Sequence, residues 1–218
     1  PQERRKFFNR IMAFNDPLYF NNIQEYSKII SQKNALLRQG KIEQIQLWNE
    51  MLAKSAVQLM KHRNSYVEQV NQHLNDIFKD ISGRTETLKL IYKPSLNSAD
   101  YEEKNCLQQL ENSLPRDLQY GFAVLGPHRD EYHLMMDGKK DRDFFSQGEF
   151  RITNLSLKMT INRLFYEGYQ FYPVLIFDDL FSELDDEVIK NVFQYFLTLK
   201  NQIFITSTSE PSGPLTVK

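Results

Sequence analysis

Apolar residues in the stretch 1–83 recur at spacings of three, four and seven, which is the period of an amphipathic α-helix. Asp16 and Pro17 predict a helix start, because aspartate caps a helix N-terminus and proline suits its first turn. Gly40 predicts its end, and a short connection to a second, longer helix predicts an antiparallel hairpin. The apolar stripe of that second helix is Ile42, Ile45, Trp48, Leu52, Ala56, Leu59, Tyr66, Val70, Leu74, Ile77 and Ile81.

The period changes at about residue 84, where short runs of apolar and β-branched residues predict strands. The expected strands are residues 86–92, 120–126, 131–145 with a turn at Asp137-Gly138, 174–179 and 202–208. The expected helices are one that follows the loop of residues 95–105, one at 148–168 and one at 185–200. The last strand, helix and strand predict a right-handed βαβ unit with parallel strands.

Composition narrows the class of protein without naming a function. The 218 residues are 41% hydrophobic and 25% charged, with a formal net charge of −1, which is typical of a globular protein and gives no overall sign of a nucleic-acid binder. Cys106 is the single cysteine, which excludes an intrachain disulfide and fits a reducing compartment. The basic N-terminal residues lack the apolar stretch of a signal peptide, and no run is long enough for a membrane span.

Two adjacent carboxylates stand out near the end of the chain, because the apolar run 174–177 leads directly into Asp178 and Asp179. Such a run predicts a strand that is buried on both faces. In α/β proteins the carboxyl ends of strands collect ligand chemistry: one carboxylate can hold Mg²⁺ beside a phosphate, and its neighbour can orient water. The alternative is a solvated strand end that caps the next helix, and this pattern alone leaves the two about even.

A second candidate is the stretch Ser146, Gln147, Gly148 and Glu149 at the start of the helix predicted over residues 148–168. A helix N-terminus offers free N–H groups and a positive dipole end, and glycine lets backbone approach an anion closely. The stretch could therefore contact the γ-phosphate of a nucleotide. Simple N-capping is the alternative, and it is the better explanation of the stretch in isolation.

The ordered set of motifs is more specific than any one of them. Residues 146–149 (SQGE), 174–179 (VLIFDD) and 182–185 (SELD) resemble the signature motif, Walker B motif and D-loop of an ABC-type ATPase. With LGPHRDEYHLMMDGKK at 125–140 and QIFITST at 202–208, the chain resembles over nearly its whole length the RecF family, the SMC-like recombination mediators of bacteria.

The resemblance implies an α/β fold class, the C-terminal part of an ABC-type P-loop NTPase head with an incomplete sheet, joined to an α-helical antiparallel hairpin domain. The hairpin domain would span residues 1–83, and the part of the ATPase head would span residues 84–218. The stretches that resemble the start of the helical region are PQERRKFFNRIM and DPLYFNNIQEYSKIISQKNALL.

The resemblance also implies roles for single residues. Asp178 would hold Mg²⁺ through water, and Asp179 would polarise the attacking water where most ABC-type ATPases have a longer glutamate, which suits slow, switch-like hydrolysis. Ser146, Gln147 and Gly148 would contact ATP held by a second subunit. The remaining implied positions are Glu149 and Arg151 in support of the signature, Ser182 and Asp185 across the dimer interface, and Thr206 or Ser207 as the switch.

No G-x-x-x-x-G-K-[ST] motif occurs in the chain. In the family this phosphate-binding loop precedes the region that the chain resembles. We therefore expect the chain to be the part of a longer protein after an N-terminal ATP-binding lobe. ATPase activity, with ATP and Mg²⁺ as cofactors, is expected of the complete protein and not of these residues alone.

Two functions remain after these observations. The first is that of a RecF-like DNA replication and repair protein, a cytoplasmic ATP-dependent homodimer on double-stranded DNA at gaps and single-strand/double-strand junctions. It would support recombinase loading, with the family's RecR and RecO as partners, and its binding should be salt-sensitive and nearly sequence-blind. The second is that of a non-catalytic dimerisation or DNA-binding module, because the phosphate-binding loop is missing.

The stretch His128, Arg129 and Asp130 is similar to a kinase catalytic loop, but the required Asn and a following DFG are missing, which excludes a kinase. His128 and His133 are better explained as surface or strand histidines than as metal ligands. Arg129 could reach a phosphate, or pair with Asp130 or Asp141.

The N-terminal basic residues leave a second open point. They could contact DNA phosphates, or form the solvated first turn of a helix, which is slightly favoured. They are Arg4, Arg5, Lys6 and Arg10, and they flank Phe7 and Phe8.

Overall fold

A computed structural model of the chain describes residues 2–97, 101–140 and 145–207. The chain forms two compact units, one of Pro1–Val67 with Tyr92–Tyr132 and one of Glu68–Ile91 with His133–Lys218. This division does not follow the expected boundary between residues 83 and 84. The reason is that the segment 92–132 packs with the N-terminal helices, whereas the end of the longest helix packs with the C-terminal residues.

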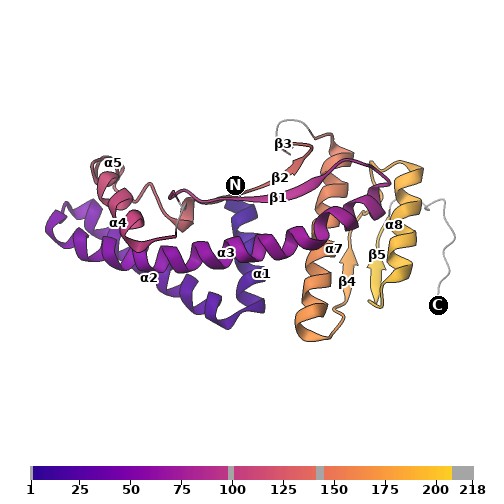
Figure 1. The fold of residues 1–218 in the computed structure, drawn as a ribbon, viewed down its shortest axis with the longest axis horizontal. Coiled ribbons are helices and arrows are strands. Elements are labelled where there is room, and N and C mark those ends of the chain that lie inside the picture. The colour runs from indigo at the N-terminus through magenta and orange to yellow at the C-terminus, as the bar shows by residue number, and fades with distance from the viewer. Residues whose placement is uncertain (1, 98–100, 141–144, 208–218) are drawn as a thin grey trace. The chain divides into compact units, whose positions relative to one another are not determined.

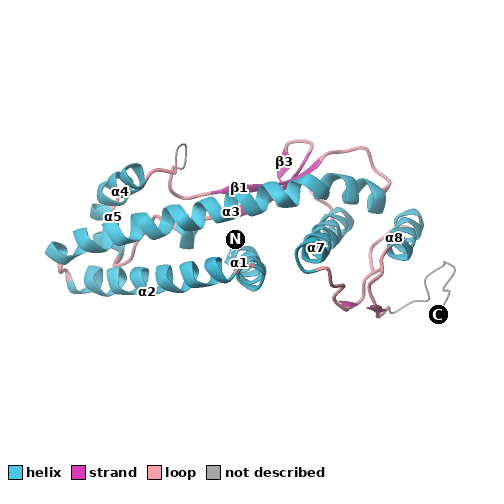
Figure 2. Cartoon of the chain, turned by 60° about the horizontal axis from the view of Figure 1, so that its bottom comes forward, coloured by secondary structure: helices cyan, strands magenta, loops and turns pink. Residues whose placement is uncertain are grey.

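The first unit contains the expected helical hairpin. Its helices are α1 (Gln2–Asn15), α2 (Pro17–Gln39), the 3-10 helix η1 (Ile42–Gln44) and the first part of α3 (Ile45–Ser82). The side chain of Asp16 accepts a hydrogen bond from the Leu18 N–H at 2.8 Å, and Gly40 ends α2 with a φ of 66°. α2 lies beside the first part of α3 in both views of the ribbon, so the predicted hairpin is confirmed (Figures 1 and 2).

The segment after the hairpin differs from its prediction. It contains α4 (Glu103–Asn112), α5 (Leu114–Tyr120) and the 3-10 helix η2 (Pro127–Arg129), so the strand expected at residues 120–126 is wrong. The backbone N–H groups of this stretch bond to side chains in place of a neighbouring strand. Ala123 N–H donates to Asn34 Oδ1 and Val124 N–H donates to Asp117 Oδ1, both at 2.8 Å.

Two buried ion pairs hold the first unit together. Lys33 Nζ lies 2.8 Å from Asp117 Oδ2, and Arg63 Nη1 lies 2.6 Å from Asp130 Oδ2, with all four side chains almost fully buried. A buried charge is tolerated only when it is paired and hydrogen-bonded, and Asp130 also accepts from the Ser95 N–H at 2.8 Å. The first pair fixes α2 to α5, and the second fixes α3 to the residue after η2.

The N-terminal basic residues contribute to the same packing. Arg4 Nη1 donates to the Tyr132 carbonyl at 2.9 Å, and Arg5 Nη1 donates to the Asp130 carbonyl at 2.8 Å. Phe8 is buried and stacks on Tyr132, with 4.4 Å between ring centroids. Arg4 and Arg5 therefore anchor α1 within the first unit, which is a sufficient reason for their presence without DNA.

A small sheet of three strands has the order β1 (Leu88–Lys93), β2 (Glu131–Met136) and β3 (Lys139–Lys140). β2 and β3 are antiparallel, with Met136 opposite Lys139. The predicted turn at Asp137-Gly138 is confirmed, and both residues have positive φ values, 46° and 79°, as a tight hairpin turn requires. The part of the predicted strand over residues 141–144 lies outside the described residues.

The second unit carries the predicted βαβ elements. Helix α7 (Gln147–Tyr169) precedes β4 (Leu175–Phe177), and α8 (Asp186–Thr198) connects β4 to β5 (Ile203–Ile205). β4 and β5 are parallel, with Leu175 opposite Ile203 and Phe177 opposite Ile205. Their parallel pairing confirms the sequence-based prediction.

The expectation that this strand is buried on both faces is wrong for the described residues. Ile176 is 75% exposed and Phe204, its partner in the register, is 52% exposed. Figure 2 shows α7 and α8 on the same side of the two strands. Because side chains alternate between the faces of a strand, Ile176 and Phe204 point to the opposite, uncovered face.

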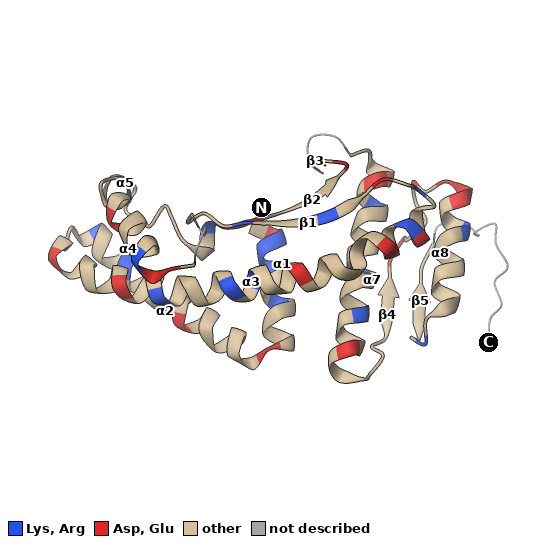
Figure 3. Cartoon of the chain, in the orientation of Figure 1, with Lys and Arg blue, Asp and Glu red and all other residues tan. Residues whose placement is uncertain are grey.

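Figure 3 shows Lys or Arg residues and Asp or Glu residues interspersed along α2 and α3, in accord with the small net charge. Among the described residues, no helix is long and apolar enough to span a membrane.

His128 is locked in one tautomer inside the first unit. Tyr26 Oη lies 2.6 Å from Nδ1, and Nε2 lies 3.0 Å from the Ala123 carbonyl. A carbonyl only accepts, so Nε2 carries the proton and Nδ1 accepts from the tyrosine hydroxyl. Both ring nitrogens are therefore engaged by protein groups. The expectation of a surface or strand histidine is wrong for His128, because it lies in η2 and packs against Tyr26.

The buried position of His128 predicts a pH-dependent stability. Burial lowers the pKa of His128 to about 4, from the ordinary value of 6.5. Between pH 6.5 and 4 the unfolded chain therefore binds a proton that the folded chain does not, and the free energy of unfolding falls as the pH drops. We expect a loss of up to about 3 kcal/mol from this residue. Urea denaturation at pH 7 and pH 4.5 measures it.

His128→Gln should show a smaller fall over this range than the unsubstituted chain. His73→Gln is the matched control, because His73 pairs with Glu167 at 3.3 Å on a partly exposed surface. Equal pH profiles for His128→Gln and the unsubstituted chain would contradict the assignment.

Candidate functional site

The parallel pairing of β4 and β5 brings the two adjacent aspartates next to Thr206. Thr206 follows β5, and its N–H donates to the Phe177 carbonyl at 2.9 Å, which continues the strand pairing by one residue. The Thr206 hydroxyl then donates to Asp178 Oδ1 at 2.5 Å and accepts from the Asp179 N–H at 3.0 Å. One hydroxyl therefore orients both residues at the carboxyl end of the sheet, where α/β proteins place ligands.

Asp179 has two further unusual features. Its φ is +47°, in the left-handed region that non-glycine residues seldom adopt and that costs roughly 1–2 kcal/mol. Its Oδ1 is buried and has no hydrogen-bond partner among the residues that the structure describes. A buried carboxylate oxygen without a donor is unfavourable unless a ligand, ion or water completes it.

The signature stretch forms the N-terminus of α7. The Ser146 side chain accepts from the Glu149 N–H at 3.2 Å, and Glu149 Oε2 accepts from the Ser146 N–H at 2.8 Å, which is a capping box. Glu149 Oε1 also pairs with Arg84 Nη1 at 2.8 Å. The Ser146 N–H and the Arg84 guanidinium lower the pKa of Glu149. The N-capping interpretation of Ser146 is thus correct, and the exposed hydroxyl keeps a free lone pair for a ligand.

Arg151 joins this helix to the aspartates. Its Nη1 donates to the Asp179 carbonyl at 2.9 Å, and its Nε lies 3.3 Å from Glu183 Oε2. The Gln147 side chain, with its amide nitrogen turned toward Glu183, donates to Glu183 Oε1 at 2.6 Å and to Oε2 at 2.9 Å. A Cβ on Gly148 would lie 3.1 Å from the Glu183 carbonyl, so only glycine fits this approach without a shift.

A hollow of about 520 Å³ opens beside these residues. Asp178, Asp179 and Arg151 line it, together with Asn154 and Lys158 one and two turns further along α7. Both carboxylates and two cationic side chains therefore face one space. That mixture suits a metal-bound phosphate better than an apolar ligand.

The donor set fits Mg²⁺ held in part by another group. No cluster of three or more potential metal-ligating side chains occurs among the described residues. Mg²⁺ often takes only one or two protein carboxylates and completes its octahedron with water and phosphate oxygens. Asp178, which is exposed directly after β4, matches that pattern.

The structure places the other predicted residues as follows. Asp185 accepts from the Val188 N–H at 2.9 Å and so caps α8. The alternative in which Asp178 or Asp179 caps the next helix is therefore wrong. Ser182 is partly buried in the turn between β4 and α8, and Ser207 is exposed after Thr206.

Sequence reasoning missed three residues of the site. Glu183 binds both Gln147 and Arg151, Arg84 binds Glu149, and Lys158 lines the hollow. Glu183 lies inside the D-loop motif and could have been noticed there. Lys158 lies seven residues after Arg151, a spacing that returns to the same helix face. Arg84 carried no local signal, because its partner is 65 residues away.

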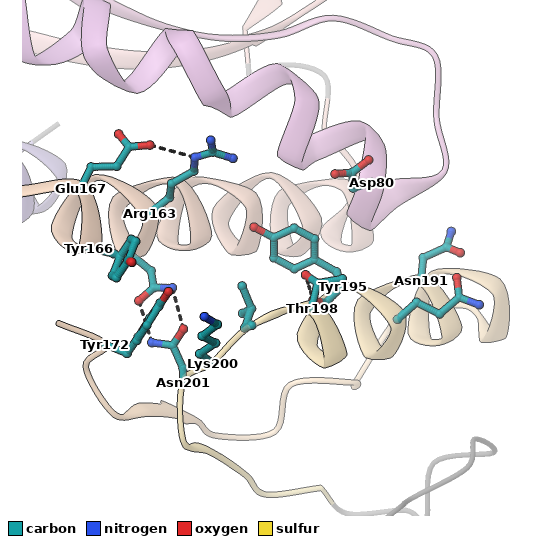
Figure 4. Close-up of a pocket in the computed structure, with 13 residues that line it drawn as sticks. Asp80, Arg163, Tyr166, Glu167, Tyr172, Asn191, Tyr195, Thr198, Lys200 and Asn201 are labelled. Atoms are coloured by element: carbon teal, nitrogen blue, oxygen red, sulfur yellow. Dashed lines mark hydrogen bonds and ion pairs between the residues drawn. The ribbon is translucent and has the colours of Figure 1, made fainter. Parts of the chain in front are cut away.

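A larger hollow of about 680 Å³ lies in the same unit, and neither Asp178 nor Asp179 lines it (Figure 4). Its polar groups already bind one another: Asn162 and Asn201 exchange two amide hydrogen bonds of 3.1 and 3.0 Å, and Arg163 pairs with Glu167 at 3.0 Å. These four side chains are therefore already paired, in contrast to Asp179 Oδ1 beside the other hollow.

Comparison with known proteins gives a consistent family. No protein-family model matches the chain. The chain is 30% identical over 213 residues to the DNA replication and repair protein RecF of Geotalea uraniireducens, and 34% identical over 219 residues to that of Listeria monocytogenes serotype 4b. Each alignment covers 96% of this chain and 58% or 59% of the relative, so the chain spans less than two thirds of the relatives' length.

Solved structures agree. The structure of the recombination mediator protein RecF-ATP in the RecFOR pathway matches with a TM-score of 0.82, 30% identity and coverage of 98% of this chain and 59% of that one. The RecF-ATPrS structure matches with the same TM-score and 27% identity. The expected fold class, part of an ABC-type head with an incomplete sheet and a helical hairpin, is thereby confirmed. Over the length that aligns, the chain belongs to the RecF family and corresponds to the C-terminal portion of its members.

Proposed function

We propose that this chain supplies the hydrolytic carboxylates and the signature helix of an ATP-dependent DNA-repair switch. The observation that carries the proposal is the cluster in which Thr206 orients Asp178 and Asp179 while Arg151 links them to the N-terminus of α7. The RecF names of the relatives support a role in DNA replication and repair.

The two aspartates take different roles. Asp178 is exposed and would hold Mg²⁺ through water, and the ion when bound would neutralise charge on the nucleotide phosphates. Asp179 would accept a hydrogen bond from the attacking water through its unpartnered Oδ1 and so orient it. Arg151 and the Thr206 hydroxyl hold the backbone of Asp179, which fixes the direction of that oxygen.

The signature helix would act on a second subunit. Ser146 and Gln147 are exposed at the N-terminus of α7, and the capping box fixes the Ser146 side chain, which supports a contact with a γ-phosphate. ATP bound by one protomer would thus bind the signature of its partner, and hydrolysis would release the dimer. The complete protein would carry the phosphate-binding loop for that ATP.

The biological setting follows from the relatives. The complete protein would dimerise with ATP on double-stranded DNA near gaps and junctions, and would support recombinase loading. The structural relatives are described within a RecFOR pathway, which supports RecO and RecR as partners. DNA binding through phosphates would fall steeply with salt.

The second candidate is a binding module without nucleotide chemistry. Its supporting observation is the missing Walker A motif in these residues. The buried, unpartnered Oδ1 of Asp179 argues against it, because a purely structural aspartate at this position would be expected to satisfy both oxygens. ATP-independent dimerisation of the complete protein would favour the module.

Asp179→Asn in the full-length protein should separate binding from hydrolysis. The amide keeps the backbone contacts of residue 179 but is a poor acceptor for a water proton, so turnover should fall roughly a hundredfold or more. The ATP dissociation constant should change little, and the ATP dimer should persist. Single-turnover hydrolysis and equilibrium ATP binding measure the two effects. Glu187→Gln, in the first turn of α8, is the matched control, and equal loss in both variants would refute the assignment.

Ser146→Asp should prevent ATP-dependent dimerisation without unfolding the protomer. Aspartate is as good an N-cap as serine, but its carboxylate repels a phosphate. Sedimentation with and without ATP should show an ATP-dependent dimer for the unsubstituted protein and a monomer for the variant, with unchanged thermal stability. Thr198→Ala, which also removes an exposed hydroxyl, should dimerise normally. A Ser146→Asp protein that dimerises with ATP would exclude the signature role.

A further inference from the structure

Exposed aromatic rings and arginines gather around the end of α5 in the first unit, and none of them belongs to the set of residues proposed for the nucleotide site. Tyr120, the last residue of α5, is 54% exposed and Phe122 is 38% exposed. Their rings stack with 5.8 Å between centroids and 27° between planes. The Arg129 guanidinium lies over the Phe122 ring, 4.9 Å from its centroid.

Two more arginines belong to this cluster. Arg116 precedes Tyr120 by four residues on α5, and this spacing puts the two on one helix face. Gly121 follows Tyr120 and has a φ of 72°. A Cβ built on Gly121 would lie 3.5 Å from Cγ of Arg38, so Arg38, in the last turn of α2, is close to the end of α5. Arg38, Arg116 and Arg129 are all exposed.

The carboxylates nearest in sequence do not neutralise these arginines. Asp117 follows Arg116, but it is buried against Lys33. Asp130 follows Arg129, but it is buried against Arg63. The ion pair of Arg129 with Asp130, one of the alternatives from the sequence, is therefore wrong.

Within the described residues, no carboxylate forms an ion pair with Arg38, Arg116 or Arg129. The fold thus turns the acids inward and leaves three cations around an aromatic pair. Such a surface is electrostatically complementary to a polyanion and sterically open to a flat ring.

We infer that this cluster, named here the α5 platform (Arg38, Arg116, Tyr120, Phe122 and Arg129), binds nucleic acid where a duplex ends in an unpaired strand. Arginines contact phosphates, and an unpaired base stacks on the exposed face of Tyr120. Bases inside a duplex already stack on their neighbours, so an aromatic platform adds binding energy only at an unpaired base. The inference rests on the proposed function for its DNA partner and for the junction, and it adds the surface that would bind them.

Fluorescence anisotropy of the full-length protein tests this with two probes, a short blunt duplex and the same duplex with a single-stranded extension. Tyr120→Ala should weaken binding to the extended duplex about tenfold and leave the blunt duplex within about twofold. Tyr120→Trp should restore the preference, because tryptophan also stacks. A 2-aminopurine at the first unpaired position should be quenched by the unsubstituted protein and not by Tyr120→Ala.

The arginines have a separate readout. The double variant Arg38→Ala and Arg116→Ala should weaken binding to both probes, and the slope of log affinity against log salt should become shallower by about 2.

The matched control for Tyr120→Ala is Phe20→Ala, which removes an aromatic ring of similar exposure, 47%, from α2. No change in binding is expected for this control.

The outcomes distinguish two failures. If the unsubstituted protein binds neither probe, the DNA partner of the proposed function and the platform both fail. If it binds both probes and Tyr120→Ala changes neither or changes both equally, only the junction platform is overturned. The surface would then serve a different partner, such as an acidic protein segment.

Discussion

The guanidinium of Arg151 is the group on which the arrangement of the candidate site depends. It reaches from the first turns of α7 to the Asp179 carbonyl and to the Glu183 carboxylate, and so connects the signature helix to the strand end. The ion pair is partly exposed and contributes little stability by itself. Its importance is geometric, because a planar guanidinium with several donors can fix two backbone segments at once. Asp179 and Glu183, its two partners, are also the residues of the site with left-handed backbone.

This connection has a mechanistic consequence in the proposed dimer. The signature stretch of one protomer would face ATP on the other, while Asp179 would act on ATP of its own protomer. Gln147 and Arg151 both bind Glu183, and Arg151 also binds the Asp179 carbonyl. A movement of the signature stretch on binding the partner's phosphate would therefore shift the backbone of Asp179. A built-in link of this kind suits a slow switch, in which hydrolysis should wait for dimer formation.

Much of this could be read from the sequence, and the exceptions have physical reasons. The helices of the hairpin and the turn between β2 and β3 could be predicted, because Asp16, Gly40 and the Asp137-Gly138 pair act on their own stretch of backbone. The strand expected at residues 120–126 failed, because Asn34 and Asp117, distant in sequence or on another element, satisfy its N–H groups. The same long-range pairing hid the cause of the exposed arginines, since Asp117 and Asp130 look like natural partners until their burial is known. In the site, motif order predicted Ser146, Asp178 and Asp179, whereas Arg84 was unpredictable because only the fold brings it to Glu149.

The central claim is that one working site combines the signature of one protomer with the carboxylates of the other. Mixing Ser146→Asp with Asp179→Asn protein, each inactive alone, tests it most directly. A heterodimer would contain one site with both defects and one intact site, so each heterodimer should hydrolyse ATP at roughly half the rate of an unsubstituted dimer, by the symmetry of a two-fold dimer. No recovery, in a mixture shown to form heterodimers, would mean that Ser146 and Asp179 serve the same protomer's site and would contradict the account.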